Sequence, residues 1–281
     1  MCIRDRLQSL TQQSFKDFEV IVVEDGSSIP CKPVTEKYQE LLDVHYYDKP
    51  NSGPGQTRNY GAERSKGEYL IILDSDCILP EGYFLAVEEE LQHEAADAFG
   101  GPDRAHESFT NIQKAINYSM TSFFTTGGIR GGKKKMDKFY PRSFNMGVRQ
   151  EVYQALGGFS RMRFGEDIDF SIRIFKGGYT CRLFPGAWVY HKRRTDFRKF
   201  FKQVHNSGIA RINLYKKYPE SLKLVHLLPA AFTLGVAIFL LGTPFCPYSL
   251  LPIALYALLV CMDSTIRNLS LIHISEPTRP Y

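Results

Sequence analysis

The stretch that most constrains this chain is the apolar run Tyr69–Leu73, which leads directly into Asp74-Ser75-Asp76. The run is short and branched, so it predicts a buried strand rather than a helix. If the chain stays extended past the strand, Asp74 and Asp76 point the same way and present their carboxylates to one point. Ligands of open α/β sheets bind at this edge, and paired carboxylate oxygens suit Mg²⁺ or Mn²⁺ held together with a substrate phosphate. The tripeptide is common, and a solvated turn after a strand is the alternative interpretation.

Strand-like and helix-like patterns alternate over the first two thirds of the chain. Strand-like runs lie at residues 18–23, 44–47, 69–73, 98–101, 143–148, 180–184 and 187–190. Helical patterns lie at residues 7–14, 34–42, 57–65, 81–92, 112–124, 150–156 and 167–176. Alternation of this kind predicts an α/β domain with a parallel, doubly wound sheet.

The net charge of +5 comes from one region of the chain. Residues 192–223 contain ten Lys and Arg against Asp196 and Glu220, an excess larger than that of the whole chain. Because the basicity is local, the charge does not indicate a nucleic-acid partner. The six cysteines are scattered without metal-like pair spacing, which indicates a reducing compartment rather than a disulfide framework.

From residue 224 the composition becomes that of a membrane segment. No Asp, Glu, Lys or Arg lies between Lys223 and Asp263. Residues 224–242 are long enough to cross a bilayer, and we expect a transmembrane helical region over 224–268. The basic segment 196–223 alternates aromatic with Lys and Arg side chains, which is typical of an amphipathic helix on the cytoplasmic membrane surface. The alternative is a buried helical hairpin of a soluble domain.

Several polar motifs follow the predicted strands in a fixed order. They lie at residues 20–27, 51–61, 74–76, 145–159, 165–169 and 191. The ordered set resembles family 2 glycosyltransferases with the GT-A fold over roughly residues 7–195. The resemblance implies a mixed, mainly parallel sheet flanked by helices, followed by C-terminal amphipathic and transmembrane helices. It also implies a nucleotide-diphospho-sugar donor, a saccharide or lipid-linked acceptor, and a location at the inner or plasma membrane with the catalytic domain cytoplasmic.

The resemblance implies five donor-binding residues. Glu24 and Asp25 match the acidic pair that contacts the nucleotide, although Glu24 stands where the family usually has Asp. Taken alone, Asp25 in Asp-Gly-Ser equally suits an Asx-turn. Arg58 and Asn59 match an Arg-Asn-x-Gly motif near the start of a helix, where anions are favoured. Asp74 completes the set.

For the metal, the resemblance implies Asp74, Asp76 and His191 as ligands of a Mg²⁺ or Mn²⁺ ion on the donor diphosphate. His191 follows a predicted strand, and a lone histidine at such a place is also a common structural residue. Arg58 is expected either to pair with a phosphate or to hold Asp76 in place.

Gly165-Glu166-Asp167 resembles the catalytic acid motif. We expect Asp167 to be the general base that takes the proton of the acceptor hydroxyl, since a sugar hydroxyl is a poor nucleophile until that proton leaves. We expect Glu166 to orient Asp167 or to contact the acceptor. A single base predicts direct displacement with inversion; capping of a helix N-terminus is the alternative interpretation.

Competing functions remain for the intact protein. One is a catalytically impaired, membrane-anchored protein that binds nucleotide sugars or polysaccharide. Another is a processive synthase, but no Gln-x-x-Arg-Trp follows His191, and Trp188 is the single tryptophan. A dinucleotide-binding dehydrogenase is disfavoured because no Gly-x-Gly-x-x-Gly follows a strand, and residues 127–135 match a P-loop only in part.

Both ends of the chain break the surrounding pattern. Residues 1–6 and 271–281 resemble non-native sequence, and the family's first strand would precede residue 7. We therefore expect a fragment whose sheet lacks one strand and whose stability and donor binding are reduced.

Overall fold

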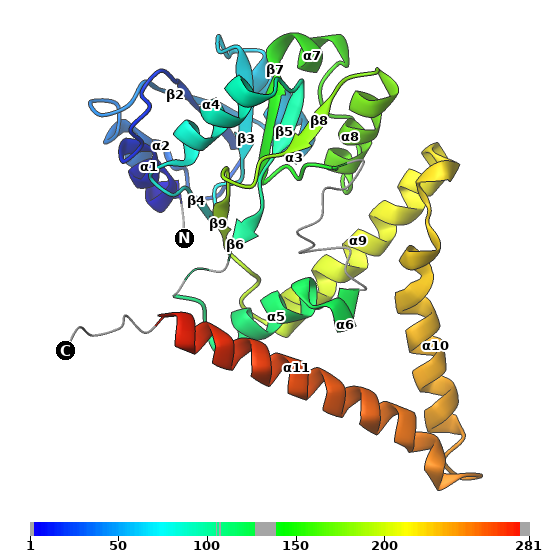
Figure 1. Cartoon of the computed structure of the whole chain (residues 1–281). Coiled ribbons are helices and arrows are strands. Elements are labelled where there is room, and N and C mark those ends of the chain that lie inside the picture. Colours follow the sequence, from blue (N-terminus) through cyan, green and yellow to red (C-terminus); the bar gives the residue numbers. More distant parts are fainter. Residues whose placement is uncertain (1–2, 105, 107, 127–138, 276–281) are drawn as a thin grey trace, which may run out of the picture. The chain divides into compact units, whose positions relative to one another are not determined.

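A computed structural model describes residues 3–104, 106, 108–126 and 139–275. The chain divides into two compact units, residues 1–114 with 133–214 and residues 115–132 with 215–281. The glycine-rich segment at 127–135 lies outside the described residues. So do residues 1–2 and 276–281 of the two ends, whereas residues 3–6 form the first turn of helix α1 (Ile3–Thr11) (Figure 1).

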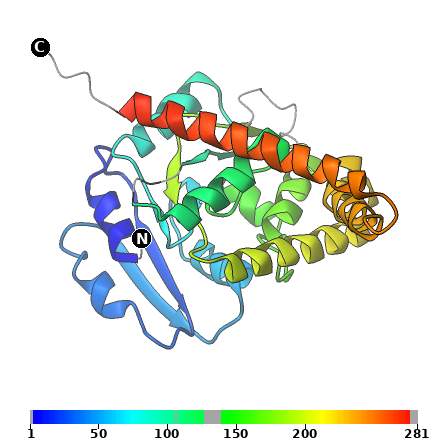
Figure 2. The ribbon, with the colours of Figure 1, turned by 90° about the horizontal axis from the view of Figure 1, so that it is seen from below.

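Two parallel strands form a small sheet in the larger unit. β1 (Val20–Asp25) pairs with β2 (Val44–Lys49) over its whole length, and α2 (Lys32–Glu36) connects them. Figure 2 shows this strand pair beside α1 and α2. α3 (Pro54–Ala62) packs on β1, where the missing side chain of Gly61 leaves room for the branched strand residues. Glu24 and Asp25 thus stand at the carboxyl end of β1.

A four-stranded sheet forms the centre of the same unit. Its order is β3 (Tyr69–Leu73), β7 (Asn145–Arg149), β5 (Ala98–Gly100) and β8 (Cys181–Leu183). β7 runs antiparallel to both of its neighbours, with Leu73 opposite Asn145, whereas β5 and β8 are parallel.

The core lies on both faces of β3. Tyr69, Ile71 and Leu73 pack against one hydrophobic cluster, which includes side chains of α1 and α4 (Tyr83–His93). Leu70 and Ile72 pack in a second cluster with α7 (Gln150–Ala155) and α8 (Glu166–Lys176). Alternate strand residues point to opposite faces. Burial on both faces therefore explains why this run is apolar throughout rather than alternating.

A small three-stranded sheet follows the central one. β9 (Val189–His191) lies between β4 (Cys77–Ile78), to which it is antiparallel, and β6 (Asp103–Arg104), to which it is parallel. The register places Cys77 opposite His191. This pairing brings the residues after β3 next to a strand more than a hundred residues later in the chain.

Helix α9 (Phe197–Lys217) covers most of the basic segment expected at 196–223. Its expected place on a membrane surface stays a prediction. Ala210 and Leu214 are buried within the larger unit, whereas Phe197, Phe201 and Ile212 are exposed.

The smaller unit is helical. It contains the greater part of α5 (Asn111–Thr121), α6 (Phe123–Thr126), α10 (Leu228–Leu241) and α11 (Leu251–Ser275), with short 3₁₀ turns at Pro219–Ser221, Leu224–Leu227 and Pro247–Leu250. Tyr118 and Ser122 donate hydrogen bonds of 2.7 and 3.0 Å to Asp263 Oδ2, which ties α5 to α11. Leu224–Leu241 and Pro247–Ile266 are long and apolar enough to cross a membrane, with mean hydropathies of 2.3 and 1.8.

The structure confirms the mixed α/β fold and the strand Tyr69–Leu73. The purely parallel, doubly wound sheet predicted from alternation alone is wrong, because β3–β7, β5–β7 and β4–β9 are antiparallel. Local alternation of strands and helices does not specify strand direction, and β7 enters the sheet between two strands that precede it in the chain.

Candidate active site

The two carboxylates after β3 lie in a tight turn rather than in extended chain. β3 ends at Leu73, and the N–H of Cys77 donates to the carbonyl of Asp74 at 3.1 Å. Because the chain turns here, the alternation that would align Asp74 with Asp76 does not apply. Asp74 pairs with Arg58, whereas Asp76 faces His191. The expected same-side geometry is thus corrected, and a shared metal role for both residues stays a prediction.

Arg6 holds this turn from inside the domain. Its side chain is buried, Nε donates to the carbonyl of Cys77 at 2.9 Å, and Nη2 donates to the carbonyl of Asp74. Burial lowers the pKa of Arg6, and the neighbouring Cys77 and Asp74 oppose that shift. No sequence motif marks this residue, and it belongs to residues 1–6, which were expected to be non-native, so sequence reasoning missed it.

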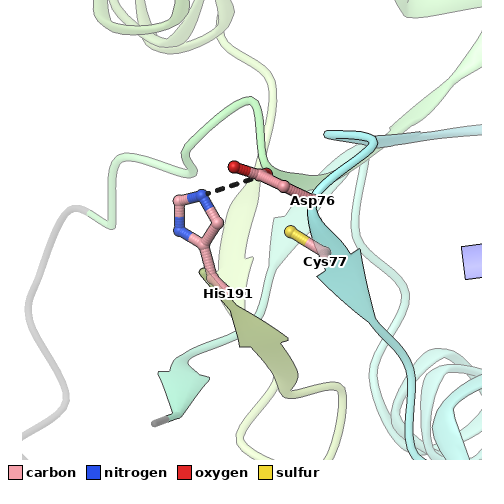
Figure 3. A group of neighbouring side chains, drawn as sticks. All are labelled: Asp76, Cys77 and His191. Atoms are coloured by element: carbon pink, nitrogen blue, oxygen red, sulfur yellow. Dashed lines mark ion pairs between the residues drawn. The ribbon is translucent and has the colours of Figure 1, made fainter. Parts of the chain in front are cut away.

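Asp76, Cys77 and His191 form the group of potential metal ligands in the described part of the chain (Figure 3). Their ligand atoms lie within 4.8 Å of one another, and His191 Nε2 is 3.5 Å from Asp76 Oδ1. The imidazole stacks on Phe144, with ring centroids 4.5 Å apart and planes 20° apart. The β4–β9 register and this stacking fix the ring so that Nε2 faces the carboxylate.

A second carboxylate lies on the other side of His191. Asp103 Oδ2 is 3.9 Å from Nδ1 and 2.6 Å from Arg193 Nη2. Burial disfavours the charged imidazole, but Asp103 and Asp76 outweigh it and raise the pKa of His191 to about 9. Burial likewise opposes ionisation of Asp103, yet His191 and Arg193 lower its pKa to about 2.

The donor set fits a hard divalent cation. Burial raises the pKa of Cys77 to about 12, so its thiol stays protonated, and it lies 3.6 Å from the carbonyl oxygen of Phe144. A protonated thiol is not a metal ligand. Asp76 offers a carboxylate oxygen, and His191 offers an imidazole nitrogen once a bound cation displaces the extra proton that its raised pKa favours. This set suits Mn²⁺ and, with water, Mg²⁺. His191 Nδ1 is buried and has no hydrogen-bond partner among the described residues, and the Asp103 carboxylate lies 3.9 Å from it.

Arg58 joins the turn after β3 to the acid motif. Nη2 donates to Asp74 Oδ1 and Nη1 to Glu166 Oε1, each at 2.9 Å. Burial lowers the pKa of Arg58, but the two carboxylates outweigh it and raise that pKa overall. Burial and the charge of Asp167 raise the pKa of Glu166, against the influence of Arg58. Arg58 therefore holds Asp74, and the alternative that it holds Asp76 is wrong.

Asn59 connects α3 to the loop before the acid motif. Its Nδ2 donates to the carbonyl of Phe159 at 2.9 Å, and its Oδ1 accepts from Phe159 N at 2.8 Å and from the Tyr153 hydroxyl at 2.6 Å. The loop passes close by because Gly158 has φ +65° and no side chain; a Cβ there would lie 2.5 Å from Asn59 Oδ1. The amide thus positions backbone, and direct contact with a donor stays a prediction.

Glu24 and Asp25 also hold neighbouring loops. Glu24 Oε2 accepts from the N–H of Cys31 at 2.7 Å. Asp25 accepts from the N–H groups of Ser52 and Gly53 at 2.9 and 3.0 Å and pairs with Lys49. Burial alone would raise the pKa of Asp25, but Lys49 and these N–H groups lower it. The carboxylates stand at the expected strand end, and a nucleotide contact stays a prediction.

Asp167 lies in the first turn of α8, beside an arginine that sequence reasoning missed. Its Oδ1 accepts from the N–H of Ile168 at 2.8 Å, and its Oδ2 lies 3.6 Å from Arg142 Nη1. In the same turn the buried Asp169 pairs with Arg173 at 3.0 Å. Arg173 in turn donates to the carbonyls of Leu156 and Gly158 at 2.6 Å, so the helix and the preceding loop are fixed together. The i, i+4 spacing of Asp169 and Arg173 is a sequence pattern that predicts an ion pair on a helix.

Comparisons with known proteins fit this arrangement. Residues 2–157 match the family described as "Glycosyl transferase family 2". A "Probable glycosyltransferase YdaM" of Bacillus subtilis is 27% identical over 213 residues, which is 72% of this chain and 50% of that protein. The chain thus spans about half the length of this curated relative.

Two solved structures share the fold. TarS residues 1–349 from S. aureus, in complex with UDP-GlcNAc, superposes with a TM-score of 0.54 at 20% identity, over 75% of this chain and 63% of that chain. The mannosyltransferase PcManGT from Pyrobaculum calidifontis, in complex with GDP-Man and Mn²⁺, superposes with a TM-score of 0.58 at 16% identity, over 94% and 76% of the two chains.

Proposed function

Because this chain belongs to glycosyl transferase family 2, we propose that it transfers a sugar from a nucleotide-diphospho-sugar to a hydroxyl of a saccharide or lipid-linked acceptor. The observation that carries the proposal is the Arg58 bridge. It joins Asp74, at the carboxyl end of β3, to Glu166 in the acid motif, through two hydrogen bonds of 2.9 Å. One guanidinium therefore links a residue suited to bind the donor to the neighbour of Asp167, the residue suited to take a proton.

The donor side comprises Glu24, Asp25, Arg58, Asn59 and Asp74. Related folds have been solved with UDP-GlcNAc and with GDP-Man, which supports a nucleotide-diphospho-sugar as the donor class. Asp25 orders the loop at residues 51–53, and Asn59 orders the loop that leads to α8. Within this set, the Arg58 guanidinium is suited to bind a donor phosphate and the Asp74 carboxylate to accept a hydrogen bond from a donor hydroxyl.

Asp76 and His191 would hold a divalent cation, with Asp74 contributing from the other side of the turn. When bound, a Mg²⁺ or Mn²⁺ ion supplies Lewis-acid stabilisation of the leaving nucleoside diphosphate. The neighbouring Asp103 carboxylate lies 3.9 Å from Nδ1, where its charge favours a proton on that nitrogen. The Mn²⁺ in the PcManGT complex supports this cofactor class.

Asp167 acts as the general base. The acceptor oxygen forms a bond to the anomeric carbon as the bond from that carbon to the donor phosphate oxygen breaks. The acceptor proton passes to an Asp167 carboxylate oxygen, and the nucleoside diphosphate leaves. One direct displacement inverts the anomeric carbon. Glu166, held by Arg58, fixes the first turn of α8 and so the direction of Asp167.

We further propose that the protein acts at the cytoplasmic face of a membrane. Leu224–Leu241 and Pro247–Ile266 are apolar enough to span it. The basic residues of α9 precede the first span, as the charge bias of cytoplasmic flanks requires. Leu234→Arg places a charge near the middle of α10, which costs about 3 kcal/mol of insertion free energy, and should release the chain on alkaline extraction of membranes.

The test is a donor screen with the full chain in membranes or detergent. UDP- and GDP-sugars are supplied with Mn²⁺, and release of nucleoside diphosphate and the anomeric configuration of the product are measured. Asp167→Asn should lower transfer by about 10²–10⁴-fold, the usual contribution of a general base, with donor binding retained. Near-normal transfer by a folded Asp167→Asn variant would reject the base, and undiminished transfer in excess EDTA would reject the cation. Nucleotide binding without turnover would indicate a protein that only binds nucleotide sugars. A series of products of increasing length would indicate a processive synthase.

A further inference from the structure

The three carboxylates at the start of α8 are neutralised unequally. Glu166 and Asp169 each pair with one arginine, at 2.9 and 3.0 Å. Arg142 lies 3.6 Å from Asp167, and the charges of Asp167 and Arg142 both act on Arg211 of α9, although Arg211 makes no ion pair with Asp167. Two arginines therefore lie in the surroundings of Asp167, the group proposed to take the acceptor proton.

Arg211 reaches this place because α9 packs directly on the turn before α8. Gly165 precedes Glu166 with φ +83°, and a Cβ there would lie 3.0 Å from the Ala210 Cβ and 3.4 Å from Leu214 Cδ1. Both of these α9 residues are buried. Arg211 follows Ala210 in the helix, so the contact that seals the turn also places the guanidinium beside the acid motif. A purely lipid-facing helix would not position it there.

The excess positive charge is not matched by other acidic groups in the described part of the chain. No ion pair within 4.0 Å joins Arg211 to a described carboxylate, although the residue is partly buried. Burial and Arg142 both lower the pKa of Arg211, whereas Asp167 opposes this. Two guanidinium groups around one carboxylate leave a net positive charge, which a bound anion would neutralise. The guanidinium fork matches the oxygens of a phosphate in a bidentate manner.

We propose that Arg142 and Arg211 bind a phosphate group of the acceptor and so position its hydroxyl at Asp167. This inference rests on the proposed glycosyl transfer and narrows its acceptor to a phosphate-bearing molecule. The donor diphosphate is assigned elsewhere, to the turn after β3, where Arg58 and Asp76 lie. The pair Arg142 and Arg211 is on the Asp167 side, where the acceptor must enter.

The experiment compares acceptors that differ in phosphate. The full chain in detergent is given an active donor and one of three acceptors: a saccharide linked to a short prenyl chain through a diphosphate, the same saccharide as a neutral alkyl glycoside, or a polyol phosphate oligomer. The wild type should prefer the phosphate-bearing acceptors by about tenfold or more in kcat/KM, the usual size of a lost charged hydrogen bond. Which of the two phosphate-bearing acceptors the wild type prefers shows whether the natural acceptor carries a lipid diphosphate or a polymer phosphate.

Arg211→Gln should raise the KM for the phosphate-bearing acceptor by about tenfold or more, while the KM for the neutral glycoside and for the donor changes little. Arg211→Lys, which keeps the charge, should lose less. Arg198→Gln removes the same charge from an exposed position of the same helix and serves as the matched control with unchanged kinetics. Thermal unfolding of each variant separates loss of fold from loss of binding, and Arg142→Gln gives a second, independent test.

The outcomes separate this inference from the proposed function. Donor cleavage and transfer at equal efficiency to neutral and phosphate-bearing acceptors would overturn the phosphate site but leave glycosyl transfer intact. An equal loss with all acceptors in folded Arg211→Gln would also overturn it, because it would show a structural role of α9. Absence of donor cleavage by the wild type under every condition would reject the proposed function itself.

Discussion

Replacement of Arg58 by methionine tests the link between the donor side and the acid motif. Methionine keeps the length and much of the apolar contact of the side chain but removes both hydrogen bonds. The side chains of Arg58 and Glu166 are 16% and 10% exposed, so their pair is largely buried. Breaking one partner of a buried pair costs about 3–5 kcal/mol, since it leaves an uncompensated charge. The Asp74 side chain is 36% exposed, and that half of the bridge adds only about 0–1 kcal/mol.

We therefore expect Arg58→Met to lower the free energy of unfolding by about 3–4 kcal/mol at pH 8. The loss should shrink at lower pH, and the sign follows from Glu166. Burial already raises the pKa of Glu166 above its ordinary value, and removal of Arg58 raises it further. The folded state then binds a proton more tightly than the unfolded state, so the penalty is present above the folded pKa and is relieved as the pH falls through it.

The assay is urea unfolding of the detergent-solubilised chain, followed by the fluorescence of Trp188, the single tryptophan. Glu166→Gln in the Arg58→Met background removes the unpaired charge and should recover about 2 kcal/mol, a coupling within the range of contacting residues. The reasoning is refuted if Arg58→Met costs less than about 1 kcal/mol, or if the double variant loses the plain sum of the two single losses.

Three further predictions concern the residues around the site. Gly158→Ala should destabilise the fold by about 2–4 kcal/mol, because its backbone is left-handed and the added methyl group would break the hydrogen bonds of Asn59. Gly157→Ala is the control: it has φ +71° but open space around it, and should cost only about 1 kcal/mol. Chemical denaturation compares the two variants. Cys77→Ser should leave Mn²⁺ affinity within about twofold of the wild type, because a protonated thiol is not a ligand, and a tenfold loss in titration calorimetry would contradict this. Asp25→Asn should lower stability by about 1–3 kcal/mol at pH 7; because the folded pKa of Asp25 lies below its ordinary value, that loss should fade as the pH drops below about 4.

The sequence by itself determined the local elements and the order of the motifs. The apolar run Tyr69–Leu73 forms the strand that its branched composition predicts, and it is apolar throughout because both of its faces are buried. Residues 224–241 are apolar enough to span a membrane whatever surrounds them. These features depend on neighbouring residues, whose spacing and composition can be read along the chain.

The tertiary structure alone decided which groups act together. The Arg58 to Glu166 bridge joins residues 108 positions apart, and the β4–β9 register sets Cys77 opposite His191. The turn at Asp74 separates two carboxylates that an extended strand would have aligned. The packing of Ala210 on Gly165 brings α9, which carries Arg211, to the start of α8. Such pairings depend on strand direction, register and packing between distant segments, which no local pattern encodes.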